Sequence, residues 1–133
     1  MKREQVRIQK EEINARDRMG QTALILGCQL GNLKIIEELI SIGADVNAKA
    51  IEASDGYTAL HYVSENGNLE ILKLLLCHQA DVFLTNDFGE TPFALAEKYE
   101  HQSIAEILQQ EVIVFLYIFV LKLSQYQNSQ SFV

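Results

Sequence analysis

The chain has 133 residues, enough for one compact domain, and its 48% apolar and 22% charged residues with a single proline exclude a disordered protein. Its formal net charge is −7. No cluster of lysine and arginine stands out that could neutralise nucleic-acid phosphates. We therefore do not expect nucleic acid as a partner, and a protein with a basic or mixed surface suits the acidity better.

The first ten residues are charged and weakly patterned, so we expect residues 1–10 to be disordered or a frayed helix. No apolar run follows these charges, which argues against a secretory signal. The two cysteines, Cys28 and Cys77, are too few for a disulfide framework. We expect reduced thiols in a protein of the cytoplasm or the nucleus.

Three stretches of the chain share one pattern. Their first glycines, Gly20, Gly56 and Gly89, are spaced by 36 and 33 residues. Self-similarity at this period predicts stacked repeats, because one repeat cannot bury its own apolar face and stacked neighbours can. Asn14 precedes Asn47 by 33 residues, so residues 11–16 are interpreted as the end of a degenerate preceding repeat.

Each repeat is predicted to contain a short helix, a tight turn, a longer helix and a loop. Gln79 occupies the place that Gly43 has one repeat earlier, so we expect a looser turn at Gln79. The third repeat has Glu100 where glycine is expected, which is typical of an end repeat. Threonines are expected to cap the first helices, glycines to end them and asparagines to cap the second helices: Thr22, Thr58 and Thr91; Gly31 and Gly67; Asn32 and Asn68.

The segments GYTALHYVSENGNLEILKLLL and GADVNAK resemble the ankyrin repeat, which has a period of about 33 residues and a TPLH-type helix start. The resemblance covers residues 11–110: a half repeat at 11–16, then repeats at 17–52, 53–85 and 86–110. It implies an all-α fold, an α-solenoid of about three repeats with β-hairpin fingers. It also implies a protein-interaction module, so we expect a monomeric adaptor or inhibitor with a protein partner.

Stacks of this family generally bind proteins through their finger tips and the concave side of their first helices. By position, the fingers are Arg16–Gln21, Lys49–Tyr57 and Leu84–Glu90, and the outward first-helix positions are Leu26, Gln29, Tyr62, Glu65, Leu95 and Lys98. The candidate partner-binding residues are Arg18, Met19, Gln21, Ile51, Asp55, Tyr57, Tyr62, Glu65, Asp87, Phe88 and Glu90.

Three aromatic residues, Tyr57, Tyr62 and Phe88, are the expected anchors, since large rigid side chains dominate interface energetics. The alternative is that Tyr57 and Phe88 only pack along the hairpins. The second finger is three residues longer than the period and carries Ile51. This extra length either grips a partner or reflects tolerated drift in an exposed loop.

We find no pattern typical of an enzyme. By the resemblance, His61 ties the start of its helix together with Thr58, and His101 is expected to be a capping or surface residue. Cys77 and His78 are neighbours, and neighbours on a helix do not face each other, so they are a poor nucleophile pair. No metal-ligand spacing or glycine-rich phosphate loop is present. We expect no catalytic, cofactor-binding or metal-binding residue and no small-molecule substrate.

Residues 111–133 leave the repeat pattern. Val112–Leu121 are ten apolar residues in a row, followed by Lys122, Leu123 and a polar tail. A spanning helix needs about twenty apolar residues, so we expect a strand-like or helical segment folded over the open end of the stack. The alternatives are cover by a partner, a membrane anchor formed by residues 112–123, and a truncated fragment of a larger ankyrin array.

Overall fold

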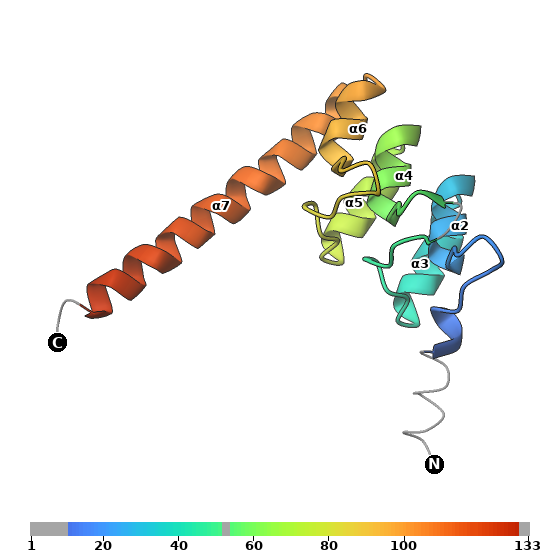
Figure 1. Cartoon of the computed structure of the whole chain (residues 1–133), viewed down its shortest axis with the longest axis horizontal. Coiled ribbons are helices and arrows are strands. Elements are labelled where there is room, and N and C mark those ends of the chain that lie inside the picture. Colours follow the sequence, from blue (N-terminus) through green and yellow to red (C-terminus); the bar gives the residue numbers. More distant parts are fainter. Residues whose placement is uncertain (1–10, 52–53, 131–133) are drawn as a thin grey trace, which may run out of the picture.

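The computed structural model describes residues 11–51 and 54–130, and the predicted state of residues 1–10 lies outside this part of the chain. Helices lie side by side in pairs and the pairs stack (Figure 1). The pairs are α2 (Ala23–Leu30) with α3 (Leu33–Ser41), α4 (Ala59–Asn66) with α5 (Leu69–Cys77), and α6 (Pro92–Lys98) with the start of α7 (Gln102–Gln130). The predicted all-α repeat stack is confirmed.

The helices form two layers. The first helices α2, α4 and α6 contact one another in order, and so do the second helices α3, α5 and α7. One apolar cluster runs through both layers, and it includes Leu24, Ile36, Leu60, Ile71, Leu72, Leu75, Ile104 and Leu108. The middle repeat contributes most of the side chains with no exposed surface, because it is covered from both sides.

The predicted caps begin the helices. The Thr22, Thr58 and Thr91 hydroxyls accept hydrogen bonds from backbone N–H groups in the first turns of α2, α4 and α6. The Asn32 and Asn68 side chains do the same at the starts of α3 and α5. These bonds pair amide groups that a helix start otherwise leaves without a partner, so the caps define where each helix begins.

The expected looser turn at Gln79 is wrong. Gln79 has a φ of 64° and therefore keeps the left-handed conformation without glycine. Its N–H bonds to Leu76 at 3.1 Å, and the equivalent N–H of Gly43 bonds to Ile40 at 3.0 Å. The turn is held by these backbone bonds and by burial of Ala80 behind it, which together outweigh the cost of a side chain in this conformation.

The fingers between the repeats are joined by backbone bonds rather than by regular strands. Among the described residues, strand-like pairing is limited to an isolated antiparallel bridge between Arg16 and Thr22. Neighbouring fingers are linked where the Ile51 N–H bonds to the Gly20 carbonyl at 3.2 Å and the Asp87 N–H bonds to the Asp55 carbonyl at 2.9 Å. The fingers therefore form one row along the stack.

Asparagines in the loops after the second helices tie each repeat to the next. The Asn47 Oδ1 accepts from the Asp81 N–H at 2.7 Å, and the Asn14 Oδ1 accepts from the Asp45 N–H at 2.8 Å. Asn14 and Asn47 align in the sequence, and they make equivalent bonds. Residues 11–13 are helical, so the segment before the first full repeat carries the local features of a repeat end.

The apolar segment does not fold over the open end of the stack, so that expectation is wrong. It continues the last repeat helix, and α7 runs without a break for 29 residues. Its first turns bury Ile104, Ala105 and Leu108 against the stack, and the rest projects away from it (Figure 1). No glycine or proline interrupts Gln102–Gln130, so nothing in the backbone stops the helix at the end of the repeat.

Candidate functional site

Most of the predicted partner-binding residues meet around one side chain, Tyr57. A hollow of about 300 Å³ lies between the first finger, the second finger and α4. It is lined by the predicted residues Met19, Gln21, Asp55, Tyr57, Tyr62 and Glu65, together with Gln29 and Ser54. These residues come from two successive repeats, so the hollow exists only because the repeats stack.

Hydrogen bonds and ring contacts hold this hollow in shape. The Gln21 side chain donates to the Tyr62 hydroxyl at 3.2 Å, and the Ser54 hydroxyl donates to the Met19 carbonyl at 3.0 Å. The Tyr57 and Tyr62 rings pack at 4.9 Å between centroids. Both bonds cross from the first repeat to the second, so the wall of the hollow is preformed.

A second hollow has a volume of about 350 Å³. It is lined by Tyr57, Phe88, Glu90 and Lys98. Phe88 is 68% exposed at the tip of the third finger, whereas Tyr57 is half-buried. Both hollows have Tyr57 in their lining, and we call the two hollows together the finger groove.

Charges in the finger groove are arranged unevenly. Asp55 and Glu65 line the first hollow, and Lys98 lies in the second, 3.5 Å from a Glu90 oxygen. The Asn86 amide donates to Glu90 at 3.1 Å, and this bond together with Lys98 holds the pKa of Glu90 below its ordinary value. The first hollow is therefore acidic, and the second is close to neutral.

Burial raises the pKa of the Tyr57 phenol, and the neighbouring Glu65 carboxylate raises it further. The Tyr57 hydroxyl donates a hydrogen bond to the Glu65 carboxylate, so these two side chains form a pair in the wall of the first hollow. Tyr57 also packs on His61 at 5.5 Å between ring centroids. Tyr57 therefore packs on the α4 residues His61 and Tyr62 and also lines both hollows.

Three predicted residues lie outside both hollows: Arg18, Ile51 and Asp87. Ile51 is 44% exposed, and its backbone N–H joins the second finger to Gly20. Asp87 is exposed but lies close to Gly56, where its side chain would meet any added Cβ. These residues hold the fingers together or remain on their surface, and the two hollows form without them.

The predicted second finger, Lys49–Tyr57, includes Ser54, but the candidate partner-binding residues omit it, and the outward first-helix positions were only partly correct. Gln29 and Lys98 do line the groove, but Leu95 has no exposed surface and belongs to the core. Ser54 lies in the longer second finger, two residues before Gly56, as Arg18 lies two residues before Gly20. Its role depends on a contact with Met19 that is 35 residues away along the chain.

His61 has the predicted structural role. Its Nδ1 accepts from the Thr58 N–H at 3.0 Å, and its Nε2 lies 2.9 Å from the Glu90 carbonyl oxygen. A carbonyl can only accept, so Nε2 carries the proton and the ring is neutral. His61 thus closes a capping box at the start of α4 and also links the second repeat to the third finger.

The stability of the stack is expected to fall as the pH drops below 6.5. Burial lowers the pKa of His61 from its ordinary value of 6.5. Just below pH 6.5, His61 is therefore protonated in the unfolded chain but still neutral in the folded chain. Stability should be unaffected by His61 above pH 6.5 and should then decrease by up to about 1.4 kcal/mol per pH unit. Urea denaturation at pH 8, 7, 6 and 5.5 measures this slope.

The matched variant for this measurement is His61→Gln, whose amide does not titrate. It is expected to flatten the stability curve between pH 7 and 5.5, although the variant itself is less stable because the fit to Thr58 and Glu90 is poorer. Equal slopes for the parent chain and the variant would show that another group causes the pH dependence.

The two cysteine thiols differ in their surroundings. Burial raises the pKa of the Cys28 thiol to about 12, so Cys28 stays protonated and serves as a small core side chain. Cys77 is an exposed free thiol. Within the described residues, no group of three or more histidine, cysteine and acidic side chains is placed to hold a metal ion.

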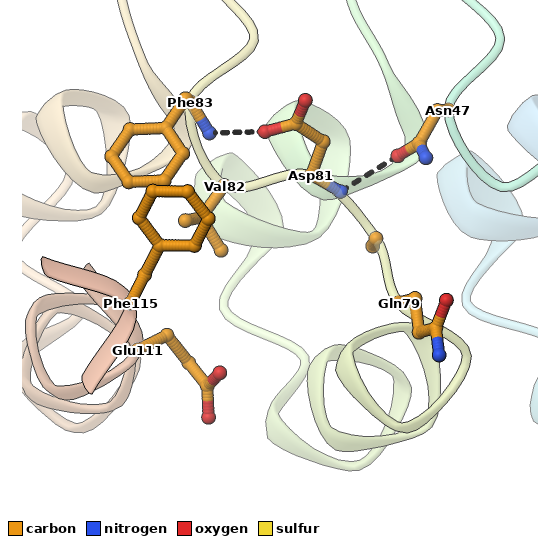
Figure 2. Close-up of a pocket in the computed structure, with 8 residues that line it drawn as sticks. Asn47, Gln79, Asp81, Val82, Phe83, Glu111 and Phe115 are labelled. Carbon is orange, nitrogen blue, oxygen red and sulfur yellow. Dashed lines mark hydrogen bonds between the residues drawn. The ribbon is translucent and has the colours of Figure 1, made fainter. Parts of the chain in front are cut away.

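A larger hollow, of about 560 Å³, lies where α7 leaves the stack. Figure 2 shows that it is open between the loop that carries Asp81 and Phe83 and the side of α7 that carries Glu111 and Phe115. The Phe83 and Phe115 rings pack edge to face at 5.0 Å between centroids. None of the predicted partner-binding residues lines this hollow, so size alone does not identify it as the binding site.

Comparison with known proteins gives consistent matches. Residues 19–51 match the family model of the ankyrin repeat, and residues 49–114 match the model described as ankyrin repeats in three copies. Protein fem-1 homolog A-like of Mus musculus is 38% identical over 103 residues, which are 77% of this chain and 15% of the mouse protein.

Two further relatives come from distant organisms. A probable E3 ubiquitin-protein ligase, XBOS34, of Oryza sativa subsp. japonica is 32% identical over 100 residues, 74% of this chain and 19% of the rice protein. A putative ankyrin repeat protein of Rickettsia bellii (strain RML369-C) is 28% identical over 107 residues, 80% of this chain and 59% of the bacterial protein. The match therefore spans between 15% and 59% of these three relatives.

Proposed function

Because this chain belongs to the ankyrin repeat family, a family of protein-interaction modules, we propose that it is a non-enzymatic adaptor or inhibitor that holds a partner protein in the finger groove. The observation that carries this proposal is the meeting of two hollows at Tyr57. Side chains from all three repeats line the two hollows, and such a surface can contact a partner over the length of the stack.

The aromatic side chains supply the anchors. Tyr57 and Tyr62 are half-buried and pack on each other, so they lose little conformational freedom when a partner binds. Phe88 is 68% exposed, and a partner would remove its apolar ring from water. Preformed tyrosines beside an exposed phenylalanine match the composition of interface hot spots.

The charges favour a partner with basic residues. Asp55 and Glu65 make the first hollow acidic, and the whole chain has a net charge of −7. A lysine or arginine of the partner would complement this end, while an apolar side chain would fit beside Phe88 in the second hollow. Complementary charge of this kind speeds association and selects partners more than it adds affinity.

The proposal includes a monomeric protein in the cytoplasm or the nucleus. The two free thiols support a reducing compartment, since an oxidising one favours disulfides. Gel filtration coupled to light scattering tests the monomer, and a fluorescent fusion in cells tests the compartment.

The experiment for the finger groove compares three variants as affinity baits from cell extract. Tyr62→Ala and Phe88→Ala change the groove, and Leu30→Ala removes an apolar side chain that is 79% exposed and lines neither hollow. The groove variants are expected to weaken binding of a purified partner at least about tenfold, about 1.4 kcal/mol, with an unchanged helical signal. Leu30→Ala should bind like the parent chain. If both groove variants bind a purified partner as tightly as the parent chain does, the interface lies on another face of the stack.

A further inference from the structure

The part of α7 from Ile113 to Leu121 is apolar on every face. From Ile113 to Leu121 each side chain is apolar and between 45% and 66% exposed. Successive residues of a helix point about 100° apart, so nine consecutive exposed positions cover the whole circumference. Residues 113–121, which we call the apolar rod, therefore expose apolar side chains around the whole helix and not along one face only.

Two ordinary explanations for such a helix do not fit. An 18-residue window of α7 has a mean hydropathy of 1.9, but only 17% of that window is buried, so it is not the core helix of a soluble protein. The helix also follows the folded repeats, so it is not a signal sequence. The match to the ankyrin models ends at residue 114, and the rod therefore lies mostly outside the repeat pattern.

We propose that residues 112–123 of α7 insert into the hydrocarbon core of a lipid bilayer and hold the repeat stack at the membrane surface. A bilayer covers a helix on all sides, which matches an apolar surface on all sides. A second copy of this chain would cover one stripe of the helix and leave the rest in water. The exposure pattern therefore favours lipid.

Length and charge define how the segment enters the membrane. Glu111 and Lys122 bracket the apolar run, and no charged side chain lies between them. At about 1.5 Å per residue, Phe115 lies about 6 Å and Phe119 about 12 Å beyond Glu111. Half of a hydrocarbon core is about 15 Å thick, so Phe119 comes close to the middle of the bilayer. Lys122 and the polar side chains that follow it in α7, residues 124–130, are unfavourable in hydrocarbon. At about 1.5 Å per residue, Gln130 lies about 28 Å beyond Glu111, which brings this polar end close to the opposite surface of the bilayer.

The rod is firmly attached to the stack. Its helix starts among buried core residues, Ile104 and Leu108, and continues without a break. Phe115 also packs on Phe83 of the loop after α5 (Figure 2). Insertion would therefore hold the stack, and with it the finger groove, in a limited range of orientations above the membrane.

The chain contains no tryptophan, so single tryptophans report depth without background. The full chain, kept in mild detergent, is diluted into phosphatidylcholine vesicles as Phe119→Trp, Phe115→Trp or Phe88→Trp. Lipids brominated near the end of the acyl chain should quench Phe119→Trp most, and bromine near the headgroup should quench Phe115→Trp more. Phe88→Trp on the third finger should not respond to deep bromine.

A charge pair of variants tests the same point by vesicle flotation. Ile118→Lys puts an ammonium inside the apolar run and should lower the bound fraction at least about tenfold, whereas Gln127→Lys, beyond the run, should bind like the parent chain. Unchanged Phe119→Trp emission in the presence of vesicles would overturn the proposal. So would an emission shift that needs no lipid and grows with protein concentration, because a second copy would then be the cover.

Membrane insertion of α7 and partner binding in the finger groove can be tested independently. No residue of the groove lies in α7. A chain that ignores vesicles but loses its partner on Phe88→Ala would keep the proposed function and reject the membrane helix. The opposite result would keep the membrane helix alone.

Discussion

Replacing Leu75 with alanine is expected to lower the free energy of unfolding by about 3–4 kcal/mol, the largest stability change that a single conservative truncation should cause here. Leu75 has no exposed surface, and its helix α5 is covered by α3 on one side and α7 on the other. Truncation removes the buried methyl groups and leaves a cavity that two rigid neighbours cannot easily fill.

The size of this change matters because the stack is short. Stability in repeat proteins is approximately a sum over repeats and their interfaces, and Leu75 belongs to the repeat that has an interface on each side. A loss of about 3–4 kcal/mol is a large part of the 5–15 kcal/mol that holds a typical domain folded.

Urea denaturation followed by circular dichroism measures the effect of Leu75→Ala, with a mild detergent present to shield the apolar part of α7. Leu30→Ala is the control, since Leu30 is 79% exposed and should change stability by less than about 0.5 kcal/mol. A loss below about 1 kcal/mol for Leu75→Ala would mean that α5 is not enclosed by its neighbours as described.

Replacing Gly67 with alanine is expected to cost about 2–3 kcal/mol, the second largest effect. Gly67 ends α4 with a φ of 79°, which costs a residue with a side chain about 1–2 kcal/mol. A Cβ there would also lie 2.5 Å from Cε1 of His101. The His101 ring is held by a bond of 2.8 Å to the Glu65 carbonyl, and moving it would lose about another 1 kcal/mol.

The chain contains a matched control for Gly67. Gly31 ends α2 with a φ of 68°, and a Cβ there would meet only the Asn68 side chain, at 3.7 Å. Gly31→Ala should therefore show the backbone cost alone, about 1 kcal/mol. Adding His101→Ala to Gly67→Ala should recover the difference, and this double-mutant cycle isolates the contact. Equal costs at Gly31 and Gly67 would show that the ring moves aside freely.

Local signals carry much of the prediction. A threonine or asparagine side chain reaches an N–H only three residues away, so the caps at Thr58 and Asn68 can be assigned without any tertiary information. The repeat period and the column of glycines that end the first helices depend on short-range geometry in the same way. Asp55, Gln79 and Glu100 are exceptions among the described residues, because a left-handed residue other than glycine depends on how well the surrounding turn is bonded.

The binding residues can be predicted only as positions in a repeat. Tyr57, Tyr62 and Phe88 follow from their places in the fingers and first helix, but which of them share a hollow depends on the offset between repeats. The hydrogen bond of Ser54 escapes prediction because its partner, Met19, lies in another finger. Partner contact by these residues remains a prediction until the groove variants are measured.

By itself, the sequence determined that this protein is an all-α stack of ankyrin repeats, because period, caps and apolar columns are local and repeated. Only the tertiary structure decided two features. The meeting of three repeats at Tyr57 depends on how neighbouring helix pairs pack. The path of α7 depends on whether packing of the apolar segment on the stack is more favourable than continuing the helix. Ten apolar residues are compatible with a folded cap or a projecting rod, and the backbone bonds of an unbroken helix favour the rod.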